Sequence, residues 1–346
     1  MNMLTTVTPQ KAVLLMNLGS PDSTAVPDVR RYLNEFLMDE RVIDIPYLAR
    51  LLLVRGIIVP FRAPKSAHAY QSIWTAQGSP LIVLTRALQN ALQARLEEPV
   101  AMAMRYGSFS PKEAFDQLQQ QYPQLKEVVL VPLYPHYAMS SYETAVVYAQ
   151  EHHKKGNYPF RLSVLKAFYQ EEVYIQALAN HIRPYLDRPY DHLLFSYHGI
   201  PERHIRKSDT TGKHCLCSAD CCDTPSPAHD TCYRHQVFTT TRLVAAQLKV
   251  PKEKYSIAFQ SRLGKGWLQP FTDIRLAEMP KEGIRNLLIL CPAFVSDCLE
   301  TLEEIAMRGK ETFLEAGGES YEMIPCLNDD PAWVEALAGW VKRSSE

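Results

Sequence analysis

The chain has 346 residues, of which 46% are hydrophobic, so it is long enough to bury a large core and to form about two domains. Its 37 Lys and Arg nearly balance its 38 Asp and Glu, and a formal net charge of -1 gives no electrostatic reason to expect nucleic acid as a partner. The N-terminal stretch MNMLTTVTPQKAVLLMNLGSP has too short an apolar run for a signal peptide and no small-residue cleavage pattern. We therefore expect a first strand there and a cytoplasmic protein.

Six short apolar segments alternate with stretches of helical length, a pattern typical of parallel sheets. They cover residues 12–18, 100–104, 128–133, 193–197, 255–259 and 287–291. Because three precede and three follow residue 170, the pattern predicts an α/β protein with two doubly wound, three-layer domains that face each other across a cleft. The predicted domains cover residues 1–170 and 171–329. Asp330 and Pro331 predict the start of a last amphipathic helix over 330–346, which crosses back onto the first domain.

The fourth apolar segment ends at a histidine, in LLFSYHGIPERH (193–204). Glycine and proline end the strand just after His198, so the imidazole is expected at the tip of a buried strand. Ligands of open parallel sheets bind outside the carboxyl ends of the strands, which favours a functional role for His198. The alternative is a buried histidine that is satisfied by a backbone carbonyl.

A row of carboxylates follows the last apolar segment, in CPAFVSDCLETLEEIAMRGKETF. Ser296 or Asp297 fits the N-cap of a helix over 296–311, on which Asp297, Glu300 and Glu304 share one face. The alternative is a solvated acidic face that the helix dipole favours. A histidine opposite such a row can bind a divalent metal, with ferrous iron among the metals that suit these ligands, or accept protons from a bound substrate.

Five segments, in this order, resemble motifs of the ferrochelatase family. They are VLLMNLGSP, PLYPHYAMSSYET, LLFSYHGIPERH, FQSRLGKGWLQPFTD and CPAFVSDCLETLEEI. The resemblance covers nearly the whole chain and implies the chelatase-like fold, in which two similar Rossmann-like domains with parallel four-stranded sheets surround a porphyrin cleft. It also implies the reaction, which is insertion of ferrous iron into protoporphyrin IX to give protohaem.

By position, the resemblance implies that His198 and Glu300 are the active-site histidine and glutamate, with Asp297 and Glu304 as acidic neighbours. Metallation removes two pyrrole protons as the metal enters, so a base on one face of the macrocycle lowers the barrier. We expect His198 to accept protons and the carboxylates to relay protons or iron. Some members of the family carry histidine where this chain has Cys298.

Residues 45–62, IPYLARLLLVRGIIVPFR, are apolar on most faces, but Arg50 and Arg55 interrupt them and argue against a membrane-spanning helix. An ordinary buried helix would have this pattern. The stretch also resembles the apolar lip of ferrochelatases, here over about 45–80, which implies contact with the inner face of the membrane. Candidate porphyrin-binding residues by the same resemblance are Tyr70, Trp74, Ser79, Arg105, Tyr106 and Trp267.

Five of the eight cysteines lie in KHCLCSADCCDTPSPAHDTCYRHQ, an insertion over 213–236. Disulfides are disfavoured in the cytoplasm, so a thiolate-bound metal is the natural interpretation. Some bacterial ferrochelatases that this chain resembles carry an internal cysteine cluster, which implies a [2Fe-2S] centre with four thiolate ligands. The candidates are Cys215, Cys217, Cys221, Cys222 and Cys232. Zinc is the alternative, because four thiolates also satisfy its tetrahedral site.

The sequence is also compatible with two other classes of function. One is a chelatase for another tetrapyrrole or metal, such as coproporphyrin, cobalt or nickel. The other is a non-catalytic haem or iron–sulfur sensor. The oligomeric state is also open, with a homodimer as one candidate.

Overall fold

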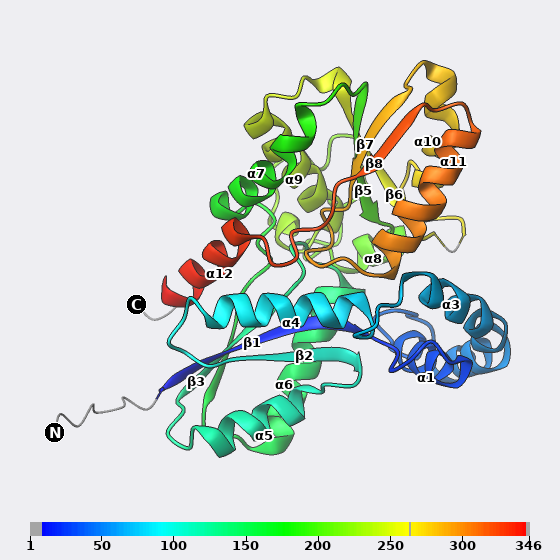
Figure 1. Cartoon of the computed structure of the whole chain (residues 1–346). Helices are drawn as coiled ribbons and strands as arrows, with labels where there is room; N and C mark the ends of the chain where they lie inside the picture. Colours follow the sequence, from blue (N-terminus) through cyan, green and yellow to red (C-terminus); the bar gives the residue numbers. More distant parts are fainter. Residues whose placement is uncertain (1–8, 263, 344–346) are drawn as a thin grey trace.

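The computed structural model describes residues 9–262 and 264–343, and this part of the chain forms two four-stranded parallel sheets in two lobes (Figure 1). The first sheet has the order β2-β1-β3-β4, and the second has the order β6-β5-β7-β8. The strands are β1 (Lys11–Ser20), β2 (Val100–Gly107), β3 (Glu127–Pro132), β4 (Arg161–Val164), β5 (His192–His198), β6 (Tyr255–Gln260), β7 (Asn286–Leu290) and β8 (Ser320–Met323). The predicted α/β class with two parallel four-stranded sheets is confirmed.

All six predicted strands are confirmed, and their ends differ from the prediction by a few residues. The two strands that the sequence did not indicate, β4 and β8, are short edge strands with mostly partly exposed side chains. An edge strand that is covered incompletely has no continuous apolar run, so the pattern that found the other six is missing from it. The division at residue 170 stays a prediction, and residues 1–8 and 344–346 of the predicted elements lie outside the described residues.

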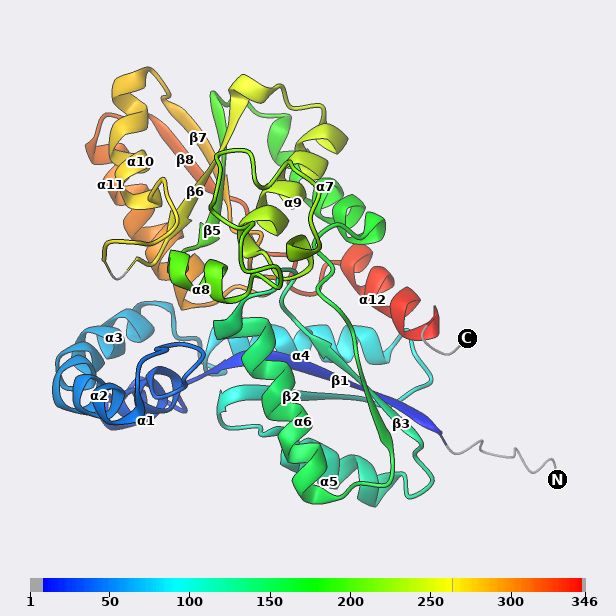
Figure 2. The same cartoon turned by 180° about the vertical axis from the view of Figure 1, so that it is seen from behind.

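Helices cover both faces of each sheet. In the first lobe they are α1 (Val26–Leu37), α2 (Tyr47–Leu51), the π-helix η1 (Leu52–Ile58), α3 (Val59–Ile73), α4 (Pro80–Gln93), α5 (Pro111–Gln121), the π-helix η2 (Met139–Glu143) and α6 (Thr144–Gly156). In the second lobe they include α7 (Glu172–Leu186), α8 (Glu202–Lys207), α9 (Tyr233–Leu248), α10 (Thr272–Glu278), the π-helix η6 (Glu300–Gly309) and α11 (Lys310–Glu315). Helices α1 to α3 project as a side lobe beneath α8 (Figures 1 and 2).

The strands are apolar on both faces because both faces are covered. Along β1, Val13 and Leu15 pack in the core with α4, whereas Leu14 and Met16 pack on the other face with α5 and α6. Successive side chains of a strand point to opposite faces, so a strand buried on both sides needs a continuous apolar run. This is why β1 to β3 and β5 to β7 are visible in the sequence.

The last helix, α12 (Pro331–Arg343), joins the lobes. It packs against α7 of the second lobe and α4 of the first (Figure 1). Its start is capped by Asp330, whose carboxylate accepts a hydrogen bond of 2.8 Å from the amide of Ala332. Trp333 and Trp340 pack against Phe168 with tilted rings, at centroid distances of 5.4 and 5.1 Å. These rings make the seam between the lobes part of one continuous core.

His136, just after β3, is a second link between the lobes. Its Nε2 lies 2.9 Å from the hydroxyl of Thr240 on α9, and its ring contacts Tyr197 and Tyr233 edge-on. Burial lowers the pKa of His136 to about 3, so the ring is neutral at pH 7. The loop after β3 is thus fixed to the second lobe without a charge.

Candidate active site

Strand β5 brings His198 to the carboxyl edge of the second sheet. Its neighbour in register on β6 is Gln260, whose backbone carbonyl accepts a hydrogen bond of 2.8 Å from Gly199. A Cβ atom at Gly199 would lie 2.7 Å from that carbonyl oxygen, so glycine is required there. The hydroxyl of Tyr233 donates to the carbonyl of His198 at 2.9 Å. The backbone at the strand tip is therefore held from both sides.

The imidazole of His198 is half-buried, and its ring lies 6.1 Å from the ring of Phe294. Within the described part of the chain, no group hydrogen bonds to either ring nitrogen. A core histidine satisfied by a backbone carbonyl, the alternative for this residue, is not what the structure shows. The ring nitrogens stay available to a ligand.

Two of the predicted carboxylates lie beside the same edge. The side-chain amide of Gln260 donates to the backbone carbonyl of Glu300 at 3.2 Å. The next residue, Ser261, donates its backbone N–H and its hydroxyl to the carboxylate of Glu304, at 2.9 and 2.6 Å. The end of β6 therefore fixes η6 next to the strand that carries His198.

Glu300 faces the first lobe. Burial is the main reason why the pKa values of Tyr32 and Tyr70 lie well above the usual tyrosine value, and the negative charge of Glu300 raises both further. Leu299, one residue earlier, packs into the apolar cluster of α1 and α3 that contains these two tyrosines. The carboxylate of Glu300 thus sits where the two lobes meet.

Asp297 is not part of this row, although the sequence predicted that it shares a face with Glu300. Its buried carboxylate accepts hydrogen bonds of 2.8 Å from the side chains of Thr301 and Asn328, and longer ones of 3.3 Å from the amide of Cys326. The prediction was wrong because it assumed a helix from residue 296, whereas the π-helix covers Glu300–Gly309 and Asp297 lies before it in a non-helical segment. Through these hydrogen bonds, Asp297 connects the start of η6 to the loop before α12.

The aromatic candidates on the first lobe gather in one cluster. Tyr70 contacts Trp74 edge-on at 6.0 Å, and Tyr32 contacts both Tyr70 and Tyr106, at 6.4 and 6.5 Å. The sequence singled out three of these four rings and missed Tyr32, which lies in an ordinary amphipathic helix, α1. Its T-shaped contacts make it the centre of the cluster.

Arg105 is already paired within the first lobe. Its guanidinium lies 2.5 Å from the carboxylate of Asp39 and 2.7 Å from the hydroxyl of Thr144, and it is stacked between the rings of Tyr106 and Tyr148 at 4.2 Å from each. Burial raises the pKa of Asp39, but hydrogen bonds from Thr144 and the amide of residue 41, with the charge of Arg105, lower it below its usual value. Asp39 lies in a loop and belongs to no motif, so nothing in the sequence marks it as a partner of Arg105.

The remaining two candidates lie apart from the cluster. Trp267 belongs to the second lobe, where it forms a backbone bridge with Pro201 and its ring stands 3.4 Å from the position of a Cβ at Gly199. It therefore flanks the turn that follows His198. Ser79 is buried at the start of α4.

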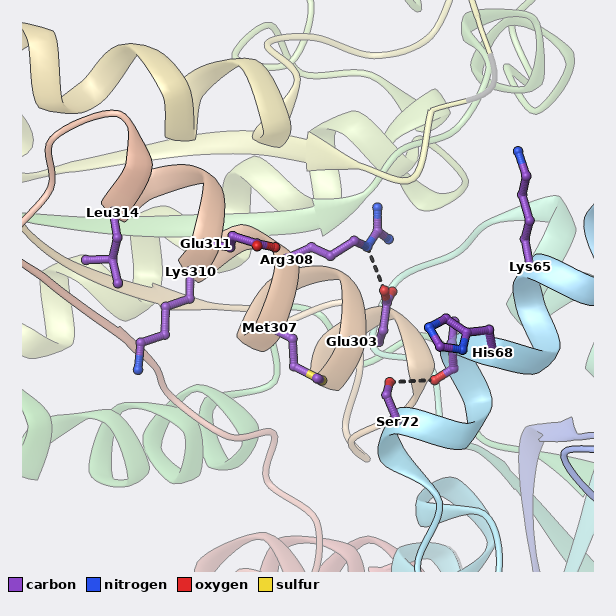
Figure 3. A pocket seen from close by; sticks show the side chains of 10 residues that line it. Lys65, His68, Ser72, Glu303, Met307, Arg308, Lys310, Glu311 and Leu314 are labelled. Atoms are coloured by element: carbon purple, nitrogen blue, oxygen red, sulfur yellow. Dashed lines mark hydrogen bonds and ion pairs between the residues drawn. The ribbon is translucent and has the colours of Figure 1, made fainter.

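A cavity of about 550 Å³ opens between α3 of the first lobe and the outer side of η6 and α11 (Figure 3). Glu303 lines it and points toward Arg308, with which it forms an ion pair of 2.7 Å. His68 and Ser72 face this pair from α3 (Figure 3). The ion pair of Glu303 with Arg308 and the hydrogen bonds of Glu304 with Ser261 therefore lie on different sides of the helix.

The cysteine insertion brings four buried thiols into a chain of contacts. Cys232 hydrogen bonds with Cys215 and with Cys222, which in turn contacts Cys221, whereas Cys217 is exposed. Burial raises the pKa of Cys215 to about 11, and the contact with Cys232 together with burial raises that of Cys222 further. The guanidinium of Arg234 lies 3.5 and 3.3 Å from the sulfurs of Cys221 and Cys222.

These thiols do not converge on one point. Over residues 9–262 and 264–343, no three His, Cys, Asp or Glu side chains are grouped so that they could hold a metal ion. The predicted [2Fe-2S] centre therefore stays a prediction.

The predicted lip exposes large apolar side chains. Tyr47, Leu48, Leu52, Ile57 and Phe61 are between 58% and 75% exposed, on α2, η1 and the start of α3. None of the helices in the described ranges is both long enough and apolar enough to cross a bilayer. The ordinary buried helix, the alternative for this stretch, is excluded by this exposure.

Comparison with known proteins agrees with these features. A family model described as "Ferrochelatase" matches residues 10–345. The chain is 53% identical to the ferrochelatase of Opitutus terrae over 338 residues, which cover 96% of this chain and 97% of that protein. It is 50% identical to the ferrochelatase of Pseudomonas entomophila over 331 residues, which cover 95% of this chain and 97% of that protein.

Two solved structures share the fold at low sequence identity. SirB from Bacillus subtilis, solved with Fe3+, gives a TM-score of 0.55 at 13% identity and covers 97% of this chain and 95% of its own. DR2241 from Deinococcus radiodurans, a multi-domain protein with structural similarity to chelatases, gives 0.52 at 11% identity over 97% of this chain and 55% of its own.

The contacts of Asp297 predict a role in stability. In Asp297→Asn, an N–H₂ group would replace an oxygen that now accepts hydrogen bonds, which leaves buried donors unpaired and lowers the free energy of unfolding by about 2 to 3 kcal/mol. Denaturant unfolding would measure this loss. Asn328→Ala is the matched change, and the two effects should not add, because the residues share one interaction. Wild-type stability of Asp297→Asn would contradict the assignment.

Proposed function

Because the chain belongs to the ferrochelatase family, whose members insert ferrous iron into protoporphyrin, we propose that His198 is the group that accepts the pyrrole protons in this reaction. The observation that carries the proposal is a half-buried imidazole on a rigid strand tip, without an internal partner for its ring nitrogens. A neutral imidazole can take up a proton on a ring nitrogen and pass it on in each cycle.

Metallation requires that two N–H protons leave while the metal forms bonds to the four pyrrole nitrogens. The rigid tip of β5 supports a base held at a constant distance from the macrocycle, so little reorganisation is needed when the proton moves. Each proton passed to solvent regenerates the neutral ring. His198 thereby contributes acid–base chemistry, and the iron is a substrate.

The carboxylates of Glu300 and Glu304 extend away from this point along η6. We propose that they attract ferrous iron and carry protons away, because both lie along the helix that β6 fixes beside β5. Carboxylate oxygen and imidazole nitrogen are ligands that suit ferrous iron. For Asp297 we propose only the supporting role that its hydrogen bonds indicate.

The porphyrin would lie against the aromatic cluster of the first lobe. Tyr70, Trp74 and Tyr106 offer flat apolar contacts, and we propose that Trp267, which lies beside the turn after His198, contacts the macrocycle from the second lobe. Arg105 supports this wall through its stacking on Tyr106, and we propose that Ser79, which is buried at the start of α4, also belongs to the porphyrin site. A macrocycle between the two sides would have one face toward His198.

The proton-accepting role predicts a large and selective loss of activity. His198→Ala should reduce the rate of ferrous insertion by about 10² to 10⁴, because a positioned acid–base group contributes that much. Anaerobic metallation of protoporphyrin would be followed by the loss of porphyrin fluorescence. Glu300→Gln should also be strongly impaired, whereas Glu303→Gln should stay close to wild type, because Glu303 is engaged with Arg308 on another side of η6. Near-normal turnover of folded His198→Ala would overturn the assignment.

For the insertion, we propose a [2Fe-2S] centre held by Cys215, Cys221, Cys222 and Cys232. These four thiols are buried and linked by contacts, and a nearby guanidinium can offset the charge of bound thiolates. Cys217 is the fifth and surplus cysteine, because it is exposed and outside that chain of contacts. Ligation would require the four sulfurs to move together, and the binding energy would then stabilise the insertion.

The proposed [2Fe-2S] centre can be tested by its metal content and absorption, without an activity assay. Protein made anaerobically should contain about two irons and two sulfides per chain and absorb visible light. Cys217→Ser should keep iron, sulfide and colour, whereas Cys232→Ser should lose all three and unfold at lower temperature. A colourless protein with about one zinc per chain would refute the iron–sulfur centre in favour of the alternative.

We also propose that the lip rests on the inner face of the membrane. Its exposed apolar side chains are flanked by the exposed cations of Arg55, Arg62 and Lys65, and this combination favours anionic lipid surfaces. An apolar porphyrin could then pass between the membrane and the cleft without crossing water.

Binding to vesicles tests the lip. The wild-type protein should bind vesicles that contain phosphatidylglycerol, and the double change Leu48→Ser with Leu52→Ser should weaken binding by about tenfold or more, since each removes an apolar side chain from the contact. Leu243→Ser on α9 is the matched control, because Leu243 is also an exposed leucine but lies outside the lip. Equal binding of all three proteins in a sedimentation assay would contradict this role.

A further inference from the structure

A single buried carboxylate connects the lip to the segment that follows His198. Asp44 lies in the loop between α1 and α2, and its side chain is only 5% exposed. Three ionisable side chains of α8 surround it, from the opposite lobe. Arg203 Nε and His204 Nε2 lie 2.5 and 3.3 Å from its Oδ1, and Lys207 Nζ lies 3.3 Å from its Oδ2.

The backbone on both sides of Asp44 is also fixed. The buried guanidinium of Arg50 on α2 donates to the carbonyls of Ile43 and Ile45 at 3.1 and 3.2 Å. The hydrogen bonds of Arg50 therefore attach the loop to the first helix of the lip. The ion pairs of Asp44 attach the same loop to α8. Burial raises the pKa of Asp44, but the hydrogen bond from Arg203 and the neighbouring cations lower it below the usual value, so the carboxylate is charged at pH 7.

On the other side, α8 is connected closely to the strand tip. Only Gly199, Ile200 and Pro201 separate it from His198. The amide of Glu202 donates to the carbonyl of Gly266 at 2.9 Å, which attaches the start of α8 to the loop that carries Trp267. Figure 2 shows α8 directly above the side lobe of α1 to α3. A movement of the lip relative to α8 must therefore break the contacts of Asp44.

We propose that Asp44 and the basic residues of α8 form a latch that positions the lip over the porphyrin and releases it when substrate enters or product leaves. Asp44 is thus a positioning residue, which acts on the porphyrin through the lip and takes no part in proton transfer. Arg203 and Lys207 are each 55% exposed, so solvent can replace them as the latch opens. The inference rests on the proposed role of the lip as the cover of the porphyrin.

The latch predicts a selective effect of Asp44→Asn. Without the negative charge the lip should open more often, so the KM for protoporphyrin should rise by about fivefold or more, while the KM for ferrous iron and kcat stay within about twofold. Hydrogen exchange of the amides in residues 47–58 should become faster, and exchange in β1 should not change. Asp273→Asn is the matched control, because Asp273 also pairs with an arginine but is 61% exposed and lies on α10 of the second lobe.

Arg203→Gln gives a second and milder variant in case Asp44→Asn does not fold. It should raise the same KM, and the double variant should be no worse than Asp44→Asn, because both changes remove one interaction. An unchanged porphyrin KM in both variants would overturn the latch, as would a parallel loss of kcat and of global stability. Failure of the latch is distinguishable from failure of the proposed function, in which the wild-type protein would not metallate porphyrin or His198→Ala would retain turnover.

Discussion

The geometry of the site depends on the hydrogen bonds that the end of β6 makes to the π-helix. Gln260 holds the backbone at Glu300, and Ser261 holds the carboxylate of Glu304. The same two-residue segment lies beside His198 in the sheet register. Histidine and carboxylates come from strands and helices far apart in the sequence, and this junction places them together. A π-helix, which is rare and concentrated at functional sites, provides the wider turn that the junction requires.

The contacts between the two lobes are apolar at α12 and include ion pairs near the lip. On the far side from the lip, Trp333, Trp340 and Phe168 form a continuous apolar seam. These three rings exclude water and carry no charge that solvent could stabilise when the seam opens. Near the lip, the lobes are joined by the ion pairs of Asp44 with α8 and by the contact of Leu299 with the cluster of α1 and α3. Charged contacts at a surface exchange partners with water more easily than apolar contacts do, so motion is expected at the lip and not at the seam.

Burial and hydrogen-bonding or ionic partners together set the protonation states of the ionisable side chains in and near the site. His136 is kept neutral by burial, Asp39 is kept ionised by Arg105 and Thr144, and the hydroxyls around Glu300 are kept protonated. A porphyrin has a large apolar surface with acidic substituents at its edge. If the porphyrin binds as proposed, the protonated tyrosines accept its apolar surface and proton transfer is left to His198.

The sequence by itself determined the class of fold, the six strands β1 to β3 and β5 to β7, and the position of His198 at a strand end, because a strand that is buried on both faces needs a continuous apolar run. Motif order along the chain also indicated the family, which the comparisons confirmed. The edge strands β4 and β8 and the π-helix had no such signature. Local periodicity cannot distinguish a π-helix from an α-helix and does not fix where the helix begins, so Asp297 was assigned to a helix that it precedes. Only the tertiary structure showed that Asp39 forms an ion pair with Arg105 and that Asp44 forms ion pairs across the two lobes. The partners of a carboxylate in a loop come from distant parts of the chain, so they can be identified only after the chain has folded.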